Sequence, residues 1–118
     1  MPRPWRLTSP QLVENDVEDQ CKTILEMKGW KAYRLNAGIF QSLDARRKFP
    51  GAPKGTPDYI CARGVRCFLL EVKRPGGQLS EVQKAEISYL RQYYGLRVVV
   101  VDHVDQLCNF LAEHERLP

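Results

Sequence analysis

The chain has 118 residues, a formal net charge of +4, a pI of about 9.0 and 43% hydrophobic residues. This length suits one domain over residues 1–118, and the mildly basic charge permits a polyanionic partner without requiring one. No apolar run approaches the ~20 residues that span a bilayer, and the N-terminus has no apolar signal region. We therefore expect a soluble, cytoplasmic protein with no membrane partner.

The cysteines are scattered and form no Cys-x-x-Cys pair: Cys21, Cys61, Cys67 and Cys108. Zinc sites of the structural type use closely spaced ligand pairs, so this spacing disfavours zinc. Cys61 and Cys67 lie in apolar runs typical of strands, which predicts buried free thiols at both positions. His103 and His114 have no partner motif, and we expect them to be solvated or to cap helices.

The N-terminal part of the chain predicts a tail followed by a helix. Residues 1–8 are polar and are expected to form a flexible tail, and Ser9 before Pro10 marks a helix start. Apolar residues then recur at helical spacing from Leu12 to Met27. Gly29 supplies the stop signal.

A strand and a long irregular segment come next. Residues 30–35 predict a strand, whereas residues 36–56 show little regular pattern. A segment of this length in a small domain is usually functional or contains a hairpin. This segment has one acidic residue, Asp44. Its basic residues are more numerous: Arg46, Arg47, Lys48 and Lys54. This composition suits a loop that grips phosphates, and the alternative is a merely solvated loop.

Residues 59–62 and 65–72 are rich in strand-forming residues and predict a β-hairpin. A tight turn centred on Arg63 and Gly64 would place Asp58 opposite Leu69.

Three charged residues of the predicted hairpin share one face. Side chains alternate along a strand, so Glu71 and Lys73 point the same way, and the predicted register adds Asp58 as a diagonal neighbour of Glu71. Diagonal neighbours lie roughly 7–8 Å apart, within reach of one shared cation. A solvated outer face is the alternative. A turn longer or shorter by one residue would move Asp58 to the opposite face.

A turn-rich link over residues 74–79 leads to a second predicted helix. The run from Ser80 to Gln83 is a capping-box pattern, and Gly95 follows the last helical residue, Tyr94. The expected buried residues of this helix are Val82, Ile87, Leu90 and Tyr94.

Residues 96–101 form a nearly continuous β-branched run, typical of a strand covered on both faces. A last helix is predicted from Val104 to about Glu115, packing Leu107, Phe110 and Leu111. A strand, a helix and a further strand in succession imply a crossover. The fold class is therefore α/β, with a central mixed sheet flanked by helices.

Pro57-Asp58 followed by Glu71-Val72-Lys73 resembles the signature of the PD-(D/E)xK nucleases. The longer set of Gly55-Thr56-Pro57-Asp58, residues 71–77, Leu79-Ser80 and Gln83 is similar to its VRR-NUC branch in particular. The resemblance spans residues 14–101. It implies a restriction-endonuclease-like core of αβββαβα order and a single VRR-NUC-like nuclease domain.

The resemblance also implies a metal site built from oxygen donors. Asp58 and Glu71 would be ligands together with a glutamate on the first helix, and the carbonyl of Val72 would add an oxygen. Glu14 has the family's spacing to Gly29-Trp30, and Glu18, one helical turn later, is the alternative. Mg²⁺ and Mn²⁺ are the expected cofactors because both take oxygen ligands. No other cofactor is expected.

Two further residues have catalytic roles on this interpretation. Lys73 would orient or deprotonate the attacking water and offset phosphate charge. Gln83 has a complete explanation as a helix cap, and the resemblance adds a second role, since relatives carry a glutamine there that faces the active site. The residues expected to contact nucleic acid are Arg46, Arg47, Lys48, Lys54 and Arg74.

The first functional hypothesis is a metal-dependent DNA endonuclease. Small standalone VRR-NUC proteins are often viral and resemble enzymes that cleave four-way junctions, so the implied partner is branched DNA and the implied source is a phage. Cutting both strands of a junction needs two active sites, hence a homodimer. The alternatives are a catalytically silent nucleic-acid-binding module and an α/β interaction protein whose hairpin charges are only surface. The spacing does not decide whether the substrate is DNA or RNA, which shape it has, or whether one or two metal ions act.

Overall fold

The computed structural model of the chain describes residues 14–36, 39–41 and 48–114. The predicted tail and the predicted helix start at Ser9 and Pro10 lie outside these residues. Within them the elements follow in the order α1 (Glu14–Met27), β1 (Lys31–Arg34), β2 (Ile39–Gln41), β3 (Lys48–Pro50), β4 (Tyr59–Arg63), β5 (Arg66–Val72), α2 (Glu81–Tyr94), β6 (Val98–Val101) and α3 (Val104–His114).

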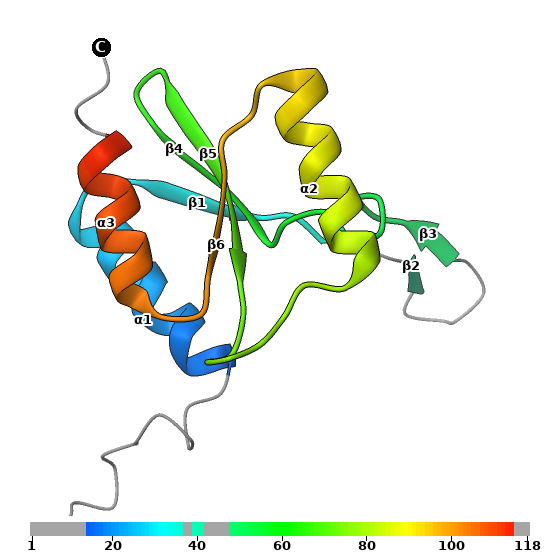
Figure 1. Ribbon diagram of the computed structural model, residues 1–118, viewed down its shortest axis with the longest axis horizontal. Helices are drawn as coiled ribbons and strands as arrows, with labels where there is room; N and C mark the ends of the chain where they lie inside the picture. Colours follow the sequence, from blue (N-terminus) through cyan, green and yellow to red (C-terminus); the bar gives the residue numbers. More distant parts are fainter. Residues whose placement is uncertain (1–13, 37–38, 42–47, 115–118) are drawn as a thin grey trace, which may run out of the picture.

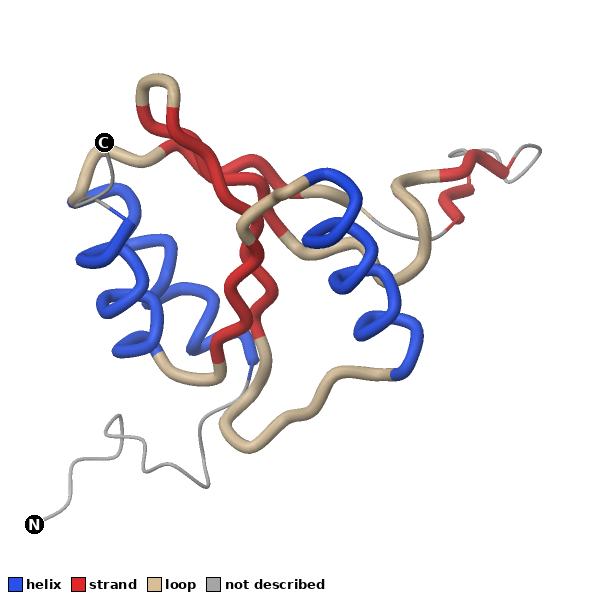
Figure 2. The backbone as a smooth tube through the Cα atoms, turned by 45° about the horizontal axis from the view of Figure 1, so that its top comes forward, coloured by secondary structure: helices blue, strands red, loops and turns tan. Residues whose placement is uncertain are grey.

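The main sheet has the strand order β1-β4-β5-β6. β4 is antiparallel to both β1 and β5, whereas β5 and β6 are parallel because α2 carries the chain back between them. The mixed sheet predicted from the order of elements is confirmed. β2 and β3 pair separately as a small antiparallel hairpin that projects past α2 (Figure 2), so the long irregular segment does contain a hairpin.

The two faces of the main sheet are covered unequally, with α1 and α3 on one face and α2 on the other (Figure 1). The side chains of β5 alternate between these layers, as strand geometry requires. Phe68, Leu70 and Val72 are buried in the larger cluster with α1 and α3, and Leu69 is buried in the smaller cluster with Ile87 of α2. Residues of β5 with odd numbers therefore face α2.

The turn of the β4–β5 hairpin lies one residue later than predicted. Arg63 pairs with Arg66, so the two loop residues are Gly64, with φ of 62°, and Val65, which is fully exposed at the tip. Both arginines are held at the end of the ladder. The Arg63 guanidinium lies over the Trp30 ring, and Arg66 donates to a backbone carbonyl of α3. With both arginines held in the ladder, Val65 lies in the loop although β-branched residues favour strands.

Several predictions of burial were wrong, because burial depends on which element lies opposite. Ile87 of α2 is buried and Leu90 is half-buried, but Val82 and Tyr94 are 49% and 62% exposed, since α2 meets the sheet along a narrow stripe. Cys61 is a buried free thiol as predicted, whereas Cys67 is exposed.

The two histidines differ. His103 precedes α3, and its Nδ1 accepts from the Asp105 backbone N–H at 3.1 Å, which confirms a capping role. His114 is buried instead of solvated, because its ring lies among Trp30, Phe68 and Phe110. Among the described residues, no helix has the length and apolarity needed to cross a membrane.

Candidate active site

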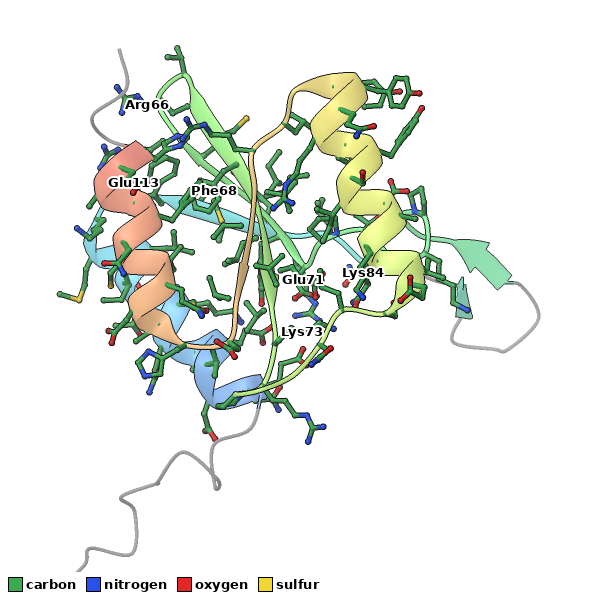
Figure 3. The ribbon with its side chains drawn as sticks, viewed as in Figure 1. Arg66, Phe68, Glu71, Lys73, Lys84 and Glu113 are labelled. Carbon is green, nitrogen blue, oxygen red and sulfur yellow. The ribbon has the colours of Figure 1, made fainter. Side chains whose placement is uncertain are left out.

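The C-terminal end of β5 brings two charged side chains to the face covered by α2. Glu71 has the same orientation as Leu69, and only 2% of its surface is exposed. Lys73 follows two residues later, and its Nζ lies 4.0 Å from Glu71 Oε2. Figure 3 shows both side chains where the chain leaves the sheet towards α2. The shared face that alternation predicted for these two residues is confirmed.

Asp58 reaches the same place from the residue before β4. The observed ladder pairs Tyr59 with Leu70, and one further step along it sets Asp58 opposite Glu71. The predicted register differs from the observed one by two residues in the pairing, so the face assigned to Asp58 is unchanged. Asp58 Oδ2 accepts the backbone N–H of Val72 at 2.8 Å, which fixes the carboxylate against β5.

Glu71 is an acid in a poor environment for negative charge. Burial is the largest of the effects that together raise the pKa of its carboxyl from 4.5 to about 8; the Asp58 side chain and the charge of Glu14 add to the rise, and Lys73 opposes it. Its Oε1 atom is buried and accepts no hydrogen bond. A buried carboxylate oxygen with no partner is costly unless a proton or a cation satisfies it.

This environment predicts that stability falls as pH rises. The folded protein keeps the Glu71 proton up to about pH 8, whereas the unfolded chain releases it near the ordinary pKa of 4.5. The native state therefore binds more protons in this window, and the free energy of unfolding decreases from about pH 4.5 to about pH 8. Glu71→Gln, which imitates the protonated acid, should unfold at a higher temperature than the wild type at pH 8.5.

Thermal unfolding of both proteins in chelator at a series of pH values is the measurement. The difference between them should shrink as the pH falls below 4.5, where the wild-type carboxyl becomes protonated in both states. A difference that stays constant across the series would contradict the assignment to Glu71 ionisation.

Gln83 joins the site from the first turn of α2. Its Oε1 accepts from Lys73 Nζ at 2.9 Å and also from the Ser80 backbone N–H at 2.9 Å. Ser80 Oγ accepts the Gln83 backbone N–H at 3.1 Å and completes a capping box. The Gln83 side chain thus caps the helix and also faces the site, as the sequence predicted.

The two candidate glutamates of α1 have different surroundings. Glu18 forms an ion pair with Arg34, with 3.0 Å between its Oε2 and NH1, and lies 3.9 Å from Lys22 Nζ. Glu14 is exposed at the start of α1, and its charge acts on Glu71. Because Glu18 is neutralised by two cations, Glu14 is the α1 glutamate that remains available to the site.

The donor set suits a hard divalent cation. Asp58 and Glu71 present carboxylate oxygens on one face, and the unpartnered Glu71 Oε1 is the atom that a cation would satisfy. In the described part of the chain, no three His, Cys, Asp or Glu side chains are close enough to form a complete metal site. Glu14 would therefore have to move closer to Asp58 and Glu71 to act as a third ligand.

Two of the predicted nucleic-acid contacts, Lys54 and Arg74, flank the site residues in the chain. Lys54 and Arg74 are both exposed, in the loop before Asp58 and in the link after Lys73. Lys48 is the first residue of β3, and Arg46 and Arg47 lie outside the described residues.

Sequence reasoning missed the cluster around Tyr59. Arg34 NH1 donates to Tyr59 Oη at 3.1 Å while it pairs with Glu18, and Lys22 lies over the Tyr59 ring. These residues come from α1, β1 and β4, so no spacing in the sequence relates them. The cluster gives Glu18 the cationic partners Arg34 and Lys22, a feature of Glu18 that helical periodicity does not predict.

The VRR-NUC domain family model matches residues 5–105, a span that contains all of these site residues. No curated protein matches the chain. The four-stranded mixed sheet, with elements in the order α-β-β-β-α-β-α apart from the β2–β3 hairpin, has the arrangement of a PD-(D/E)xK-like α/β fold. The chain belongs to the VRR-NUC domain family, a family of the nuclease type.

Proposed function

We propose that this protein is a divalent-metal-dependent DNA endonuclease that acts as a homodimer on branched DNA. The observation that carries the proposal is the buried Glu71 carboxylate, which has an unpartnered oxygen beside Asp58 and within 4.0 Å of the Lys73 ammonium. A buried acid with an unpartnered oxygen beside a second carboxyl group is costly for stability, so its presence favours a role in binding or catalysis.

Each site residue has a role that its contacts support. Asp58 and Glu71, with the Val72 carbonyl and Glu14, would hold Mg²⁺ or Mn²⁺. Such a cation supplies Lewis-acid activation of water and charge neutralisation at the phosphate. Lys73, held by Gln83, places a positive charge near the carboxylates, where it orients the attacking water and offsets negative charge on the phosphate.

The test is cleavage of labelled DNA by the purified protein. The substrates are four-way junctions, flaps, linear duplexes and single strands, each with Mg²⁺, Mn²⁺ or chelator, beside RNA versions. We expect metal-dependent cuts with a preference for the junction. Binding of DNA without any cut under all conditions would favour the catalytically silent module. The absence of both DNA binding and metal affinity would favour an interaction protein.

The homodimer follows from the geometry of the proposed substrate. A junction is resolved only when two strands are cut, and one chain carries one such site, so two chains related by a two-fold axis would present two sites. Sedimentation of the protein alone and with a junction tests this part separately. A monomer in both states would remove the dimer from the proposal without removing the nuclease.

The basic loop carries a prediction about affinity. Replacing Arg46, Arg47 and Lys48 together by Ala should weaken DNA binding and flatten its salt dependence. Each lost phosphate contact lowers the slope of log K against log salt by about 0.9 on duplex DNA, so three contacts would lower it by about 2.7. Equilibrium binding over a salt series is the measurement.

A control of equal charge separates local contacts from net charge. Lys22, Lys28 and Lys31 are exposed on α1, after α1 and on β1, and their joint replacement by Ala removes the same formal charge. This control should change the slope much less. Equal slopes for the two triple variants would show that the loop acts only through net charge.

A further inference from the structure

Residues 80–83, the first turn of α2, contact both halves of the candidate site. Gln83 Oε1 holds Lys73 Nζ at 2.9 Å. On the other side, the main chain of Val82 lies against Gly55, in the loop that leads to Asp58. We propose that this turn sets Lys73 relative to Asp58, and that Ser80 and Gly55 are its positioning residues. The inference rests on the proposed function, because it concerns the same site.

Ser80 acts on Lys73 through one shared oxygen atom. Gln83 Oε1 accepts both the Lys73 ammonium and the Ser80 backbone N–H, so the atom that closes the helix cap also holds the lysine. Ser80 Oγ in turn accepts the Gln83 backbone N–H. Without Oγ, the first turn loses about 1 kcal/mol of capping energy and frays, and the Gln83 side chain moves with it.

Gly55 acts on Asp58 through a close backbone contact. Its φ is +88°, and a Cβ built on it would lie 2.7 Å from the Val82 carbonyl oxygen. Because the contact is with backbone, a change of rotamer cannot relieve it, and either the loop or α2 must move. The displacement would pass directly to Asp58, since Pro57 between them is fully buried and Asp58 is bound to β5.

Two other glycines with positive φ lack the close contact that Gly55 makes. Gly95 also has positive φ, +62°, and ends the same helix, but a Cβ there would meet nothing within 4 Å. Gly64 has φ of +62° at the hairpin tip and is equally open. Substitution at Gly95 and Gly64 therefore imposes backbone strain without moving either half of the site, which makes them matched controls.

The experiment compares Ser80→Ala, Ser80→Thr and Gly55→Ala with Gly95→Ala and Gly64→Ala in steady-state cleavage of a DNA junction. We expect kcat to fall about tenfold in Ser80→Ala, and further in Gly55→Ala, with KM nearly unchanged. Ser80→Thr keeps a capping hydroxyl and should restore kcat. The two control variants should lower the melting temperature and leave kcat near the wild-type value.

A second measurement needs no cleavage. Acetic anhydride modifies exposed lysines, and mass spectrometry gives the rate at Lys73 relative to the exposed Lys28. An ammonium held by Gln83 should react slowly, and its rate should rise several-fold in Ser80→Ala and Gly55→Ala but not in the controls. A wild type that never cuts, combined with this pattern, would reject the nuclease and keep the positioning role.

One pattern overturns the inference. If kcat and the Lys73 modification rate follow the melting temperature across all five variants, Gly95→Ala included, Ser80 and Gly55 are structural residues only. Should Gly55→Ala fail to fold, the comparison of Ser80→Ala with Ser80→Thr decides alone. If Ser80→Thr does not restore kcat and the Lys73 modification rate stays unchanged in Ser80→Ala, the role of Ser80 is also rejected.

Discussion

Lys73→Ala should reduce the single-turnover cleavage rate by a hundredfold or more, about 3 kcal/mol of transition-state stabilisation. The ammonium lies 4.0 Å from Glu71 Oε2 and is held by Gln83, so its charge is placed where negative charge develops on the phosphate. DNA and Mn²⁺ affinities should change little. Lys73→Arg should not rescue the rate, because a guanidinium differs in shape and does not release its proton.

The measurement is single-turnover cleavage beside equilibrium binding for the wild type and both variants. Lys28→Ala removes the same charge from an exposed position after α1 and should behave as the wild type. Equal losses of binding and rate in Lys73→Ala would make Lys73 a phosphate clamp, and the proposed catalytic role would be wrong.

Asp58→Ala and Glu71→Ala should each abolish cleavage while the protein stays folded. Each carboxyl group contributes oxygen donors to the proposed cation site, and burial together with Asp58 raises the pKa of Glu71 when no cation is present. The loss of either should also remove the rise in melting temperature that Mn²⁺ is expected to give the wild type.

Glu113→Ala is the control, since Glu113 is exposed on α3, far from the site (Figure 3). Circular dichroism verifies folding, and cleavage is measured in excess Mg²⁺. Cleavage at the wild-type rate by either site variant would show that the metal site is assigned to the wrong residues.

Much of this site follows from local rules of sequence. Alternation along β5 places Glu71 and Lys73 together, and the hairpin adds Asp58 even though its turn was misplaced, because the pairing error was an even number of residues. The capping box at Ser80 and Gln83 is also predictable from the sequence, since it depends only on residues within one helical turn.

The remaining features depend on contacts between distant segments. Glu14 and Glu18 share a face of α1, and helical spacing does not predict the ion pair that Glu18 forms with Arg34 of the next strand. The buried state of His114 depends on Trp30 and Phe68, which lie far away in the sequence. The exposure of Val82 likewise depends on how narrowly α2 meets the sheet.

The unequal covering of the sheet has a consequence for local unfolding. The site faces the layer that contains one helix, in which Ile87 is the only residue of α2 that is buried. Segments with few buried apolar contacts open at lower free energy than the rest of a domain. Amide hydrogen exchange through local opening should therefore be faster in α2, which carries Gln83, than in α1 and α3.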